Sequence, residues 1–151
     1  RPQGALIRMS TLRDIRRAAL QSLYQFDCNG DDQPELIIES LAEYGGTHAT
    51  QQQGFELAQR IWTCKSEADE AVAALTPEWP THRQPVLDRN ILRLAWFELH
   101  REDTPPKVVI NEAVELAREF STEQSPLFVN GVLDKLWKIQ RGVSTTNGVE
   151  D

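Results

Sequence analysis

The sequence has little of what secreted, membrane-spanning or metal-binding proteins need. No stretch of its 151 residues approaches the roughly 18 consecutive apolar residues of a membrane span. Residues 1–10 lack the apolar run of a secretory signal, so we expect a soluble, cytoplasmic protein. Cys28 and Cys64 form no C-x-x-C motif and have no clustered histidines, which argues against a zinc site and a disulfide framework. We therefore expect no metal and no cofactor; a single Cys28–Cys64 disulfide is the alternative to two free thiols.

Positive charge is also scarce, and it is unevenly placed. The net charge is −7, which argues against a generally basic nucleic-acid binder. Residues 1–17 nevertheless carry five arginines against one aspartate, a local charge of +4, so the other residues carry −11. This asymmetry indicates either an anion-binding patch on an acidic body or a solvated basic terminus. Met9 is the only methionine, so residues 1–8 are an extension or the start of a trimmed chain.

No run of the sequence alternates with the period of two that is typical of a strand. Apolar residues recur instead every three or four positions, as in helices. Ser66-x-x-Asp69 predicts the start of the fourth helix. The last helix and the one over residues 85–101 are apolar around most of their circumference, so we expect them at the centre of the fold. We expect seven helices, over residues 11–27, 34–44, 50–64, 67–75, 85–101, 105–120 and 125–140.

The predicted fold class is an all-α, seven-helix bundle. Its domain covers residues 11–141, between a flexible basic segment over residues 1–10 and a disordered tail over residues 142–151.

Catalytic motifs are missing. The sequence has neither a phosphate-binding G-x-x-x-x-G-K-[ST] loop nor a dinucleotide-binding G-x-G-x-x-G motif. The three histidines are scattered in or beside loops, and we expect them at the surface. Three glutamates of the sixth helix are spaced as on a solvated face. These residues are His48, His82 and His100, and Glu112, Glu115 and Glu119. We expect no enzyme activity.

The first helix carries the most informative polar face. At 100° per residue, Arg13, Arg16, Arg17 and Tyr24 fall on an arc about 100° wide, beside the apolar stripe that runs from Leu12 to Phe26. Guanidinium groups bind phosphates, and a tyrosine ring stacks on unpaired bases, so this exposed face has the groups that single-stranded RNA recognition needs. The alternative is a set of solvated arginines beside a half-buried tyrosine.

Asn130 and Gly131 interrupt the apolar pattern of the last helix. Both residue types weaken a helix, and glycine costs about 1 kcal/mol relative to alanine. We interpret the pair as structural: Gly131 would allow close helix packing, and Asn130 would make a buried hydrogen bond. Direct contact with a ligand is the alternative. Trp79, in the loop over residues 76–84, and Trp96 are interpreted as core residues rather than stacking residues.

Three long segments resemble those of the NusB family of transcription antitermination factors. They are Ile91-Leu92-Arg93-Leu94-Ala95-Trp96-Phe97-Glu98-Leu99, Pro106-Lys107-Val108-Val109-Ile110-Asn111-Glu112-Ala113-Val114-Glu115-Leu116-Ala117 and Phe128-Val129-Asn130-Gly131-Val132-Leu133-Asp134-Lys135. The run Ala18-Ala19-Leu20-Gln21-Ser22-Leu23-Tyr24 is similar to the family's first helix. Order and spacing agree over residues 13–136, nearly the whole chain.

The resemblance implies a seven-helix fold and a binding function without catalysis. Family members pair with NusE, a small-subunit ribosomal protein, and bind the boxA element of nascent ribosomal RNA transcripts, so that RNA polymerase resists premature termination. By resemblance, the RNA-binding residues are Arg13, Arg16, Arg17, Tyr24 and Phe128. The candidates for contact with the ribosomal protein are Asp88, Arg89, Arg93 and Glu98. Asp14 departs from the family, whose basic segment carries more positive charge.

The resemblance also implies a larger complex with other Nus factors and RNA polymerase. Homodimerisation is left open by the sequence. Two other functions stay open as well: a NusB-like RNA-binding domain cut from a ribosomal-RNA cytosine methyltransferase, and a helical scaffold that binds protein alone.

Overall fold

The computed structural model describes the backbone of residues 2–142 and the side chains of residues 11–142. The described residues form seven α-helices and two short 3-10 helices, with no strand, which confirms the predicted all-α class. The chain packs as two compact units, Arg1–Cys64 and Lys65–Asp151. The sequence indicated one domain over residues 11–141, and each unit is described by itself below. The predicted disorder over residues 143–151 lies outside the described residues.

Unit 1 contains three α-helices: α1 (Pro2–Asn29), α2 (Pro34–Ser40) and α3 (His48–Thr63). A 3-10 helix, η1 (Leu41–Tyr44), continues α2. Helix α1 begins nine residues earlier than the sequence pattern indicated, because no proline or turn sequence interrupts it after Pro2, which suits a first helical position. Most of the predicted flexible segment is therefore helical backbone.

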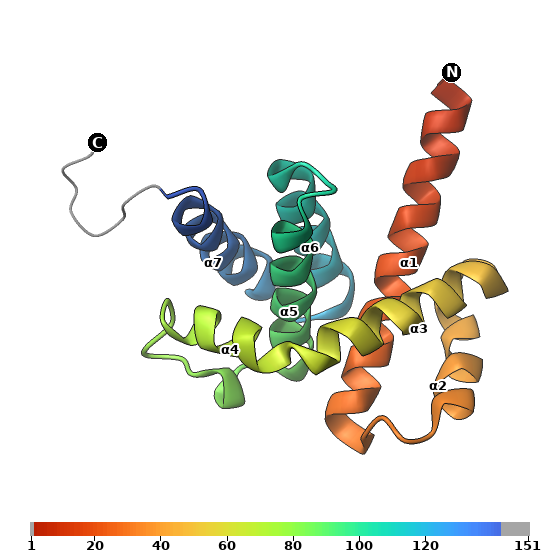
Figure 1. Cartoon of the computed structure of the whole chain (residues 1–151), viewed down its shortest axis with the longest axis horizontal. Helices are drawn as coiled ribbons and strands as arrows, with labels where there is room; N and C mark the ends of the chain where they lie inside the picture. Colours follow the sequence, from red (N-terminus) through yellow and green to blue (C-terminus); the bar gives the residue numbers. More distant parts are fainter. Residues whose placement is uncertain (1, 143–151) are drawn as a thin grey trace. The chain divides into compact units, whose positions relative to one another are not determined.

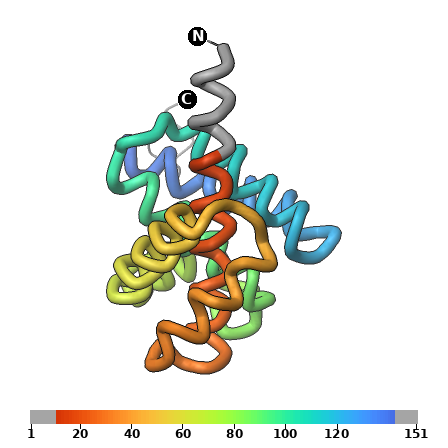
Figure 2. The backbone as a smooth tube through the Cα atoms, turned by 90° about the vertical axis from the view of Figure 1, so that its right-hand side faces the viewer, coloured from red at the N-terminus to blue at the C-terminus, as the bar shows by residue number. Residues whose placement is uncertain are grey.

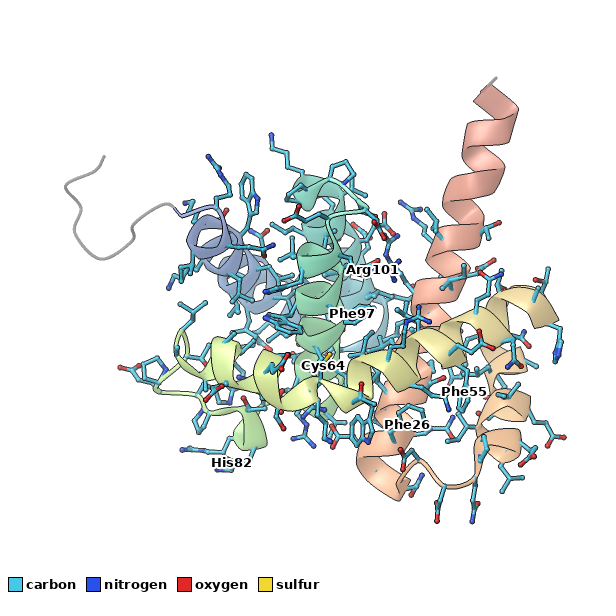
Figure 3. The ribbon with its side chains drawn as sticks, in the orientation of Figure 1. Phe26, Phe55, Cys64, His82, Phe97 and Arg101 are labelled. Carbon is cyan, nitrogen blue, oxygen red and sulfur yellow. The ribbon has the colours of Figure 1, made fainter. Side chains whose placement is uncertain are left out.

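Helices α1 and α3 cross in unit 1 (Figures 1 and 2). They lie in close contact at Gly54, where an added Cβ would lie 2.4 Å from the Ala18 Cβ and 2.7 Å from the Ile15 carbonyl oxygen. Beside this crossing the Phe26 ring meets Phe55 edge to face, with centroids 5.7 Å apart (Figure 3). A glycine at the crossing and aromatic rings next to it thus hold α3 against α1.

The start of α3 is fixed by a capping box that the sequence pattern did not indicate. The Thr47 hydroxyl accepts from the Thr50 backbone N–H at 3.1 Å, and the Thr50 hydroxyl accepts from the Thr47 N–H at 2.9 Å. The usual capping box has Glu or Gln at the second position, so a Thr–Thr pair is easily overlooked. Helix α3 consequently begins at His48, two residues before the predicted start.

Unit 2 contains α4 (Lys65–Ala73), the 3-10 helix η2 (Thr81–Arg83), α5 (Val86–Arg101), α6 (Pro106–Phe120) and α7 (Ser125–Gln140). Helix α5 is central, since α4, α6 and α7 all pack on it (Figure 1). Every residue from Asn90 to Ala95 is buried, as its all-round apolar pattern indicated. Helix α7 has the predicted bounds, but it buries only one side, through Val129, Val132, Leu133 and Leu136.

Candidate nucleic-acid interface

The arginines of α1 do not share one exposed face as expected. Arg13 is exposed and the Arg17 side chain is 31% exposed, whereas Arg16 is only 5% exposed. The helical projection placed Arg16 at the inner edge of the arc, beside Leu23, and a long aliphatic stem at such a position packs with the core. Of the three predicted RNA-binding arginines, Arg13 and Arg17 are therefore the ones available to a ligand. At the other end of the stripe Leu12 is 45% exposed, although we expected it to face inward.

Asp14 holds Arg17 from within the same helix. Its Oδ1 accepts from the Arg17 Nη1 at 3.1 Å. The aspartate side chain also packs against the turn before α3, where Gly46 has a φ of +85° and an added Cβ would lie 3.1 Å from the Asp14 Cβ. Asp14 thus has a local structural role, which limits the side-chain positions of Arg17 and reduces the positive charge of this face.

Tyr24 lies further along α1 and is 39% exposed. Cys28, one turn later, raises the pKa of the Tyr24 phenol, first through the charge of the ionised thiol and then through a side-chain hydrogen bond. Desolvation and Tyr44 act on this pKa in the same direction. Tyr24 therefore stays a neutral phenol around neutral pH, with a partly exposed ring for stacking and a hydroxyl for hydrogen bonding.

In unit 2, Phe128 is half-buried at the start of α7, and its ring lies against Trp79, with centroids 4.7 Å apart. Trp79 is 38% exposed, so our interpretation of it as a core residue is wrong for a large part of its ring. The indole Nε1 donates to the Arg83 carbonyl at 3.2 Å, and Gln84 Nε2 donates to the Trp79 carbonyl at 3.0 Å. These bonds fix the aromatic pair in place. Pro77 and Pro80 flank Trp79, and their fixed φ angles also restrict the backbone of this loop.

Asn130 and Gly131 do not have the structural role that we expected. Both are exposed, and a Cβ added at Gly131 would meet no atom of the described residues within 4 Å. Close helix packing at Gly131 is therefore wrong, and so is burial of Asn130. On the buried side of α7 the packing is made by apolar residues, so two weak helix formers are left on an open face.

The four candidates for partner contact divide by burial. Arg93 is 5% exposed and binds Asp69 of α4 in a bidentate way, with distances of 2.8 and 2.7 Å. Asp88 is 1% exposed and accepts from the Ser121 hydroxyl. Both side chains thus stabilise unit 2. The sequence pattern indicated that Asp69 marks the start of a helix, whereas in the structure its carboxylate binds Arg93 of the next helix. Arg89 and Glu98 are half-buried, and partner contact stays a prediction.

The histidines and the glutamates of α6 differ in exposure. His48, His82 and His100 are exposed, as expected, and His82 lies on η2 at the edge of the view (Figure 3). Glu115 and Glu119 are exposed, but Glu112 is 9% exposed and does not belong to a solvated face. Cys28 and Cys64 are free thiols.

The described residues include no group of three side chains that could together hold a metal ion. None of their helices is long and apolar enough to cross a membrane.

The described residues define a class: an all-helical protein with arginine and tyrosine side chains at the surface of one helix in unit 1 and a partly exposed aromatic pair in unit 2. The sequence model of the NusB family matches residues 13–138, which is most of the chain. The chain therefore belongs to the NusB family.

Similar proteins agree with this assignment. The transcription antitermination protein NusB of Desulforapulum autotrophicum is 36% identical over 131 residues, which cover 85% of this chain and 92% of that protein. The protein of the same name from Anaeromyxobacter dehalogenans is 40% identical over 126 residues, 80% of this chain and 86% of that one. The solved structure of T. maritima NusB has a TM-score of 0.72 at 33% identity and covers 83% of this chain and 89% of its own. A structure described as NusB and NusE in complex with dsRNA has a TM-score of 0.72 at 26% identity, with 87% and 98% covered.

Proposed function

We propose that this chain is a transcription antitermination factor. It binds boxA-type single-stranded RNA of nascent ribosomal RNA transcripts together with the ribosomal protein NusE, and it suppresses premature termination. It acts in the cytoplasm, within a larger complex that includes other Nus factors and RNA polymerase. Its role is binding, and the proposal assigns no chemical reaction to it.

The observation that carries this proposal is the family match over residues 13–138. Relatives that match most of the chain are named transcription antitermination proteins, and one solved relative contains NusE and RNA. The exposed Arg13, the part-exposed Arg17 and the Tyr24 ring supply groups for phosphate and base contacts.

The charge of the chain explains why a partner is needed. At −7 overall, with Asp14 beside Arg17, the protein should bind RNA weakly by itself, and added salt should weaken it further. A partner with its own basic surface would extend the phosphate contacts, and each bound component would then raise the affinity for the other.

Fluorescence anisotropy with a labelled boxA oligonucleotide tests this proposal. We expect weak binding by the chain alone and much tighter binding when NusE is present, and an oligonucleotide with the same bases in scrambled order serves as the control. Equal affinity with and without NusE contradicts the shared site. Failure to bind RNA even with NusE leaves a scaffold that binds only protein.

A further inference from the structure

Unit 1 has an acidic surface that the predicted RNA-binding residues of α1 do not explain. Residues 18–59 contain seven aspartates and glutamates and no lysine or arginine, so this stretch alone carries −7, as much as the whole chain. Six of the seven are exposed, namely Asp31, Asp32, Glu35, Glu39, Glu43 and Glu56. A surface with charge of one sign favours a partner of the opposite sign.

A groove of about 550 Å³ lies within this surface, along α2 and η1 and the start of α3. Its lining includes Glu35, Ile38, Glu39, Ala42, His48 and Gln51. At 100° per residue, Glu35, Ile38 and Glu39 share an arc about 100° wide on α2, whereas the buried Ile37 points to the other side of the helix. The half-buried Ile38 and the exposed Ala42 therefore give the groove an apolar part beside two carboxylates.

Gln51 provides an independent sign that the groove receives a hydrogen-bond donor. Gln51 is only 8% exposed, and its Nε2 donates to the carbonyl oxygens of Gly45 and Gly46 at 3.3 and 3.4 Å. These bonds hold the amide in place, and among the described residues no donor bonds to its Oε1. A fixed amide oxygen in the lining of the groove is an acceptor for an ammonium or guanidinium N–H.

We propose that this acidic groove docks a basic segment of a protein partner, in which an apolar side chain is flanked by lysines or arginines. The apolar side chain packs on Ile38 and Ala42, and the flanking cations pair with Glu35 and Glu39. The proposal goes beyond the function proposed above, because it needs neither RNA nor the arginines of α1.

The chemistry of the surface decides the class of partner. RNA and anionic membranes are repelled by a region that has acidic residues and no lysine or arginine. A small cation can pair with the carboxylates but gains little from the apolar side chains beside them. Leu36, a neighbour of Glu39 on the helix surface, is 61% exposed and extends the apolar area beyond the groove. A protein segment can use both kinds of group.

Fluorescence anisotropy with a labelled peptide of lysines and leucines tests the groove without RNA or NusE. The double variant Glu35→Gln/Glu39→Gln should bind this peptide roughly ten-fold more weakly, and its Tm should stay nearly the same because both side chains are exposed. Glu115→Gln/Glu119→Gln, an exposed pair of the same spacing on α6, is the matched control and should change the affinity less than about two-fold. Equal losses in the two double variants would show attraction to net charge alone and overturn the proposal.

Amide chemical shifts of the wild-type chain map the same binding without any substitution. The peptide should shift the amide signals of α2, η1 and the start of α3. A peptide with serines in place of the leucines should bind roughly ten-fold more weakly, because the apolar contact with Ile38 and Ala42 is lost. Equal affinity for the two peptides, or shifts confined to unit 2, overturns the proposal.

Further outcomes distinguish other occupants of the groove. If spermine shifts the same amides as strongly as the peptide does, the groove takes a free cation and the proposal is overturned. A dimer of the chain alone that Glu35→Gln/Glu39→Gln dissociates, measured by sedimentation, would place a second copy in the groove and also overturn it. If the peptide binds the groove while boxA RNA is not bound even with NusE, the proposed function fails and this inference stands.

Discussion

At the residue scale, neighbouring arginines of α1 have different roles. Arg16 is 5% exposed, whereas the Arg17 side chain is 31% exposed and pairs with Asp14. The two side chains point about 100° apart around the helix, and this angle decides which one can reach a phosphate. A functional assignment by residue type alone would treat them alike.

We predict that Arg17→Ala weakens RNA binding and leaves stability nearly unchanged. The lost ion pair with Asp14 is partly exposed, and such pairs contribute about 1 kcal/mol or less. Anisotropy with boxA RNA and thermal unfolding measure the two effects. Arg118→Ala, which removes an exposed pair with Glu115 of the same spacing, is the control and should alter neither. A large fall in Tm for Arg17→Ala would instead place Arg17 in the structure.

At the element scale, two glycines in helix interiors have opposite reasons to be there. Gly54 lets α3 contact α1, since its Cβ would lie 2.4 Å from the Ala18 Cβ. Gly131 stands on an open face of α7. The same residue type thus supports packing in unit 1 and leaves a surface free in unit 2.

We predict stability changes of opposite sign for the same substitution at these two positions. Gly54→Ala should lower the free energy of unfolding by about 1–3 kcal/mol, because the backbone atoms it meets cannot move aside easily. Gly131→Ala should raise it by about 1 kcal/mol through helix propensity. Urea unfolding of both variants measures the difference. Destabilisation by Gly131→Ala would show that α7 has packing on this side.

The contact between α4 and α5 gives another prediction. Asp69→Ala should lower the free energy of unfolding by about 2–4 kcal/mol, because it leaves Arg93 buried without its bidentate partner. This range allows for the partial exposure of Asp69. Asp134→Ala, which removes an exposed pair with Lys138, should change stability by less than about 1 kcal/mol. Equal effects of the two variants would contradict a structural role of Arg93.

The same elements show how far the sequence could predict the fold and the site. Helix α7 has the predicted bounds because Ser125-Pro126 and Gly142 mark both ends. The start of α1 was missed, since the apolar stripe does not mark it. Exposure was harder to predict than helicity: Trp79 and Gly131 were both assigned to the interior. Residue type and period indicate a helix, whereas tertiary packing decides which side of it stays open.

At the scale of the whole molecule, an acidic chain carries only small basic regions. The net charge is −7, and the predicted RNA-binding arginines of α1 that reach the surface are Arg13 and Arg17. Long-range repulsion of RNA by the other surfaces is screened by salt within about 8 Å at physiological ionic strength. Local contacts therefore decide whether RNA binds.

We predict a shallow salt dependence for the chain alone and a steeper one with NusE. Contacts from Arg13 and Arg17 to two phosphates of single-stranded RNA correspond to a slope of about −1.4 in log affinity against log salt. A basic partner adds contacts and steepens the slope. Anisotropy across a salt series measures both values, and a slope that NusE does not change would argue against a shared phosphate track.

Photochemical cross-linking tests the central claim most directly, since it maps RNA contacts on the wild-type protein. A boxA RNA that carries photoreactive uridines is bound with NusE present, irradiated, and the linked peptides are identified by mass spectrometry. We predict cross-links at Tyr24 in unit 1 and at Phe128 in unit 2, the partly exposed and the half-buried ring among the predicted RNA-binding residues. Cross-links confined to other parts of the chain would contradict the account.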